Sequence, residues 1–70
     1  MSALGRQAVL QMKYARIIEA IAEKRSVSLE KAMGLFYRSE TFPLIQDGVA
    51  DLHCRSDEYL AEEILRERER

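Results

Sequence analysis

One short segment gathers the most reactive side chains of the chain: Asp51, His53, Cys54 and Arg55. A Cys–His pair works as nucleophile and base only when the imidazole reaches the sulfur and a third group orients the ring. Adjacent residues project in different directions, and no glycine-rich turn lies beside them to form an oxyanion hole. We therefore expect no catalytic residue here, and a protein that is not an enzyme.

The same segment carries atoms that bind metal ions. With one His and one Cys in the chain, a monomer would need carboxylates to complete a site, although a symmetric dimer would double the ligands. The structural interpretation leads: Leu52 packs inward, His53 satisfies backbone groups at a turn, and Cys54 is a small apolar filler. We expect no metal and no cofactor, and keep a metal- or thiol-dependent protein using His53 and Cys54 as an alternative.

Other polar and aromatic residues favour structural roles. Glu62 and Glu63 are neighbours on a predicted helix and diverge by about 100°, which is wrong for paired acid–base work. Glu62 and Arg66 are four residues apart, which predicts a surface ion pair. Two tyrosines, Tyr14 and Tyr37, are expected at the edge of the core with their hydroxyls in water.

Composition limits the classes of function. The 70 residues carry a net charge of −1, which disfavours nucleic-acid binding, and no run approaches the length of a membrane span. Residues 1–38 hold seven basic and three acidic residues, whereas residues 39–70 hold four and nine. This split either steers association with a partner or is cancelled by helix packing within the fold. Without a signal peptide, a cytoplasmic protein is expected.

Hydrophobic periodicity predicts only helices. The first runs over 6–24, and the second over 29–38 with Ser28 as its cap. Ser39 or Thr41 caps a third helix through Leu44 and Ile45, which Gly48 ends. The fourth begins after Ser56. Residues 49–55 are left open between a turn, one helical turn and an extended piece.

The expected fold is therefore all-α: a single domain over 1–70, built as a compact small bundle of about four helices with short connections between antiparallel neighbours. Residues 1–5 and 66–70 should fray. Gly34 suggests close approach of a neighbouring helix. The second helix should bury Leu29, Ala32, Met33 and Phe36. The expected centre of the core comprises Ile17, Ile18, Ile21, Phe36, Leu44, Ile45, Leu60 and Ile64.

Two segments resemble the bacterial family called domain of unknown function 3791. These are Lys-Tyr-Ala-Arg-Ile-Ile-Glu-Ala-Ile-Ala-Glu-Lys at 13–24 with Val-Ser-Leu-Glu-Lys-Ala at 27–32, and Asp-Leu-His-Cys-Arg-Ser-Asp-Glu-Tyr-Leu-Ala-Glu-Glu-Ile at 51–64. The Leu52-His53 pair, followed by Ser56, Tyr59 and Ile64, is its most specific part. Genes of this family often neighbour those of ADP-ribosyltransferase-like proteins. The resemblance therefore implies the antitoxin-like partner of such a toxin, and it transfers no catalytic residue.

A protein-interaction module is thus the leading hypothesis, with a protein partner or a homo-oligomer expected. Val9 and Met12 fall outside the apolar stripe of the first helix, beside Lys13 and Arg16. These four residues are the expected partner-binding surface, with an apolar centre and a charged rim. The alternative is a helix-turn-helix DNA-binding regulator made from the second and third helices, against which the near-neutral charge speaks.

Overall fold

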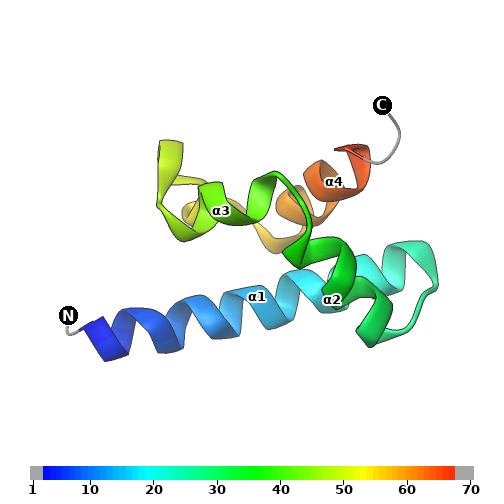
Figure 1. Cartoon of the computed structure of the whole chain (residues 1–70), viewed down its shortest axis with the longest axis horizontal. Coiled ribbons are helices and arrows are strands. Elements are labelled where there is room, and N and C mark those ends of the chain that lie inside the picture. The colour runs from blue at the N-terminus through cyan, green and yellow to red at the C-terminus, as the bar shows by residue number, and fades with distance from the viewer. Residues whose placement is uncertain (1–2, 68–70) are drawn as a thin grey trace.

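The computed structural model describes residues 3–67, apart from the side chains of residues 3, 4, 6 and 50. Its described residues contain no strand, so the predicted all-α bundle of four helices is confirmed (Figure 1). The elements are α1 (Ala3–Arg25), α2 (Leu29–Tyr37), α3 (Thr41–Gln46), the 3-10 helix η1 (Val49–Cys54) and α4 (Asp57–Glu67). The segment left open at 49–55 is thus mostly one short 3-10 helix.

Local hydrogen bonds set the helix boundaries as the sequence predicts. The hydroxyl oxygens of Ser28 and Ser56 accept the backbone N–H groups of Lys31 at 3.1 Å and Tyr59 at 3.0 Å. Ser39 similarly accepts the N–H of Phe42 at 3.1 Å, just before α3. Gly48 follows α3 with φ of 71°, a left-handed conformation that glycine adopts without strain.

An aromatic cluster holds α1, α2 and α3 together. Phe36 is fully buried, and its ring centroid lies 5.3 Å from Tyr14, 5.2 Å from Phe42 and 5.0 Å from Tyr37. Tyr14 is itself buried, so its expected place at the core edge is wrong. The sequence reasoning missed Phe42, whose ring also contacts Tyr14 and Tyr37.

Most of the predicted core is buried, with three exceptions. Leu44 is exposed because α3 turns Ile45 and Phe42 inward instead. Leu29 and Met33 are exposed because α2 is buried on the side of Ala32 and Phe36. The remaining core side chains come from α1 and α4, and all are at least nine-tenths buried: Tyr14, Ile17, Ile18, Ile21, Leu60, Ala61, Ile64 and Leu65.

α4 packs on α1, although three elements separate the two helices along the chain. Lys13 of α1 reaches Asp57 at the start of α4, while Lys24 reaches Glu62 farther along it. The two helices therefore run in the same general sense. This arrangement is feasible because α2, α3 and η1 return the chain before α4 begins.

Helices extend into both of the terminal ranges, 1–5 and 66–70, that were expected to fray. α1 already begins at Ala3, and residues 1, 2 and 68–70 lie outside the described residues. At the other end, the Glu67 carboxylate accepts the N–H of Glu40 at 2.8 Å and the hydroxyl of Thr41 at 2.6 Å. A polar anchor therefore holds the end of α4, where the sequence offers no apolar one.

Removing the centre of the aromatic cluster should unfold the protein. Phe36→Ala deletes a fully buried ring with contacts to three others, and such truncations cost about 3–5 kcal/mol. Tyr37→Ala, at an exposed neighbour, should cost clearly less. Thermal melts followed by circular dichroism check the difference, and equal losses for the two variants would contradict the assigned core.

Gly34 faces the side chain of Arg38 rather than a neighbouring helix, so that expectation is wrong. A Cβ placed there would lie 2.7 Å from Arg38 Nη2, the end of a flexible side chain that also donates from Nε to the Gly34 carbonyl. Gly34→Ala should therefore displace Arg38 and stabilise α2 by up to about 1 kcal/mol. Chemical denaturation measures this change, and a clear loss of stability would count against the assignment.

Candidate interaction surface

The reactive segment 51–55 does not assemble a site. His53 and Cys54 are both exposed on η1, so Cys54 is not the apolar filler that we expected. The ring of His53 makes no hydrogen bond to a described residue, whereas Leu52 packs partly against the core as predicted. Among the described residues, no group of three or more His, Cys, Asp and Glu side chains could hold a metal ion.

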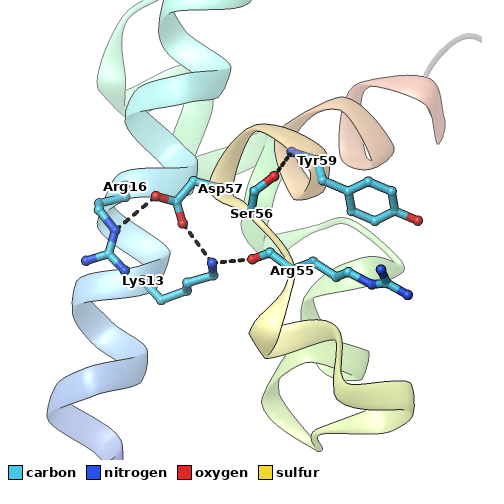
Figure 2. A network of polar contacts seen from close by, with 6 residues as sticks. All are labelled: Lys13, Arg16, Arg55, Ser56, Asp57 and Tyr59. Atoms are coloured by element: carbon cyan, nitrogen blue, oxygen red, sulfur yellow. Dashed lines mark hydrogen bonds and ion pairs between the residues drawn. The ribbon is translucent and has the colours of Figure 1, made fainter.

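The two oppositely charged parts of the chain meet inside the fold. Lys13 Nζ lies 2.9 Å from Asp57 Oδ1, and Arg16 Nε donates to Asp57 Oδ2 at 3.0 Å (Figure 2). More than two turns along α1 from Arg16, Lys24 Nζ lies 3.3 Å from Glu62 and 3.9 Å from Glu58. Of the two explanations for the split charge, these contacts favour pairing between helices of the same molecule.

Lys13 forms the junction between α1 and the beginning of α4. Its ammonium donates to the Arg55 carbonyl as well as pairing with Asp57, and its side chain is only 13% exposed. Burial of Asp57 opposes its ionisation, but the hydrogen bonds and positive charges of Lys13 and Arg16 outweigh that effect. The pKa of Asp57 is therefore lowered from its usual value of 3.8.

The four residues expected to bind a partner divide into two groups. Lys13 and Arg16 lie on the flank of α1 that faces α4, and Lys13 is unavailable as a charged rim because Asp57 and Arg55 already hold it. Arg16 remains half exposed despite its contact with Asp57. Val9 and Met12 are 53% and 63% exposed. The apolar residues of the predicted surface are thus exposed, whereas its two charged residues pair with Asp57 of the same molecule.

Val9 and Met12 belong to a wider face of α1 that points away from the core. At about 100° per residue, Ala8, Val9, Met12 and Ala15 lie on the side opposite the buried Ile17 and Ile21, and all four are exposed. We call these four residues the outer face of α1. Residues 7–12 contain no charged side chain. In Figure 1 this half of α1 forms the lower edge of the molecule.

A second exposed apolar row lies on α2. Leu29, Met33 and Tyr37 follow one another at four-residue spacing and are each more than two-fifths exposed. They continue the apolar side that begins with Ala32 and Phe36. Sequence reasoning missed this row because the helical period places Leu29 and Met33 with the core, and only the packing shows that their side of α2 is uncovered.

A surface hollow between the ends of α1 and α4 offers little binding chemistry. It is lined by Arg25, Glu62, Leu65 and Arg66. Glu62 already pairs with Lys24, and Arg66 pairs with Glu63. The expected pair of Glu62 with Arg66 is therefore wrong, because each residue has a different partner.

The helix pair α2–α3 has the short connection of a helix-turn-helix but not its charge. α3 would be the recognition helix, yet it has six residues and none is Lys or Arg. Glu40 precedes it, Asp47 follows it, and the Glu67 carboxylate covers its N-terminal end. A helix surrounded by carboxylates is poorly suited to approach DNA phosphates.

The Asp57 junction predicts an acid-dependent part of the stability. A carboxylate whose folded pKa is depressed stabilises fully above its unfolded pKa, and that contribution is lost as pH falls through the folded pKa. Asp57→Asn should therefore cost about 1 kcal/mol near neutral pH, and the deficit should shrink as the pH falls below 3.8 and through the depressed folded pKa of Asp57. Urea unfolding at several pH values measures this. Asp47→Asn, which removes an exposed carboxylate, should shift stability by less than about 0.5 kcal/mol at any pH; equal behaviour of both variants would contradict the role of Asp57.

No helix in the described part of the chain is long and apolar enough to cross a bilayer. Comparisons with models of protein families, with curated proteins and with solved structures found no match. The resemblance to the domain of unknown function 3791 therefore stays a prediction. The function must be argued from the surfaces just described.

Proposed function

We propose that this protein is a cytoplasmic, non-catalytic protein-interaction module that binds through the outer face of α1. The observation that carries this proposal is the exposure of Val9 and Met12 on an uncharged stretch of helix, with small Ala8 and Ala15 beside them. Small neighbours let another backbone approach closely, so that both large side chains can be buried together.

The energetics of such a contact are favourable. Full burial of a Val or Met side chain contributes about 1.5–3 kcal/mol, and no charge in residues 7–12 must be desolvated with them. Arg16, half exposed at the edge, can contribute a polar rim. The α2 row of Leu29, Met33 and Tyr37 is a second apolar surface, but the charged Glu30 lies beside it on the helix.

The resemblance supplies a candidate for the partner. If the chain shares the biology implied by that family, the partner is an ADP-ribosyltransferase-like toxin and this protein is its neutralising member. A DNA-binding role has less support, because α3 offers no positive charge.

The substitution pair Val9→Glu and Met12→Glu tests the surface. Burying two carboxylates in an apolar contact should weaken association by about thirty-fold or more, which corresponds to about 2 kcal/mol. Folding should be unaffected, since both side chains point away from the core. Sedimentation of the purified protein, capture of partners from the native host and circular dichroism measure the three effects.

The chain offers a matched control for added charge. Gln7→Glu with Gln11→Glu introduces the same two carboxylates on exposed residues of the same helix, but outside the outer face. This control should associate like the unchanged protein. Identical self-association and identical captured proteins in both double variants would overturn the proposed function, whereas loss of helix in the first variant alone would show that the outer face is misassigned.

A further inference from the structure

We infer that the occupant of the outer face is a second copy of this chain, paired through antiparallel α1 helices with the two-fold axis at Met12. This inference rests on the proposed function and names the partner of the same surface. In such a pair, residues whose numbers add up to 24 lie at the same height on opposite helices. Met12 then faces Met12 of the other copy.

Side-chain sizes on the outer face are complementary about Met12. Three residues away, Val9 on one side meets Ala15 on the other. Four residues away, Ala8 meets Arg16, and seven residues away Gly5 meets Glu19. In each of these pairs a larger side chain is set against a small one, which lets two helices interdigitate at a close interaxial distance.

The charged residues that adjoin the outer face fit the same register. Arg16 and Glu19 are exposed and flank the apolar centre, and the antiparallel copy sets each of them against an uncharged residue. No like charges are therefore opposed. A parallel pair would instead align Arg16 with Arg16 and Glu19 with Glu19, and opposed like charges are destabilising.

The first half of α1 also needs such a partner. None of the described side chains from Gln7 to Met12 is buried, and Leu10 alone among them packs partly against the core. Helical segments this short have little stability without packing. The contact spans about 20 Å of helix from Gly5 to Glu19, and such a single helix pair is at the small end of specific interfaces. The dimer should accordingly depend on concentration.

Cysteine cross-linking tests the register. Cys54 is first replaced by Ser, which removes the only native thiol, an exposed one. Met12→Cys in this background places two thiols at the two-fold axis, so mild oxidation should give a disulfide-linked dimer in high yield. Gln11→Cys is the adjacent exposed residue about 100° around the helix, and it should cross-link poorly.

Glu23→Cys distinguishes the two directions of pairing. Glu23 is exposed on the same side of α1, but in the antiparallel pair the two copies of residue 23 are about 33 Å apart along the axis. It should not cross-link, whereas a parallel pair would join it as readily as Met12. Efficient cross-linking at Glu23, or equal yields at Met12 and Gln11, would overturn the proposed register.

Sedimentation of the reduced Cys54→Ser protein completes the test, and it should show a monomer–dimer equilibrium. A monomer at every concentration, without a Met12 cross-link, would overturn the second copy as occupant. That result leaves the proposed function standing if Val9→Glu with Met12→Glu still abolishes capture of a different protein. The two failures are therefore distinguishable.

Discussion

The structure depends on burial of one side of α1. Ile17 and Ile21 have no solvent exposure, and the two longest other helices, α2 and α4, both pack against this helix. The hydrophobic contribution of a 70-residue chain is small, so loss of this single apolar side would leave the shorter elements without support. Polar contacts then choose among the packings that the apolar side permits: Lys13 fixes where α4 begins, and Lys24 fixes how it continues.

The placement of these apolar and polar contacts along α1 also explains which part of the helix is free to bind another molecule. From Tyr14 onward the helix is enclosed by the aromatic cluster on one flank and the acidic residues of α4 on the other. Residues 7–12 have few contacts with the rest of the fold, and none of them is charged. A helix that is amphipathic in its second half and apolar on two sides in its first half suits a domain that completes its packing with another molecule.

The sequence predicts where the helices begin and end, but it does not predict which side of each helix is buried. The caps at Ser28 and Ser56 and the stop at Gly48 are encoded within a few residues, so local chemistry predicts them. Leu29 and Met33 were wrongly expected in the core because the helical period of α2 cannot tell which half of a wide apolar side will be covered. The sequence also does not show that Lys13 joins α1 to the beginning of α4, because its partners lie more than forty residues away along the chain. Within the expected partner-binding surface, Val9 and Met12 can be recognised from the sequence because they fall outside the helical period of the buried apolar residues of α1. The sequence alone does not show that Lys13 is held within the fold while Arg16 stays half exposed.

The carboxylate of Glu67 gives the last turn of α4 an influence on the order of folding. It accepts the free N–H of Glu40 and the hydroxyl of Thr41, which are the groups that a six-residue helix exposes at its start. These contacts close a loop of more than twenty-five residues, so they form only after α4 has docked on α1. α3 therefore acquires its final contacts late, once α4 is in place. During synthesis on the ribosome, α3 can make these contacts only after α4 has emerged.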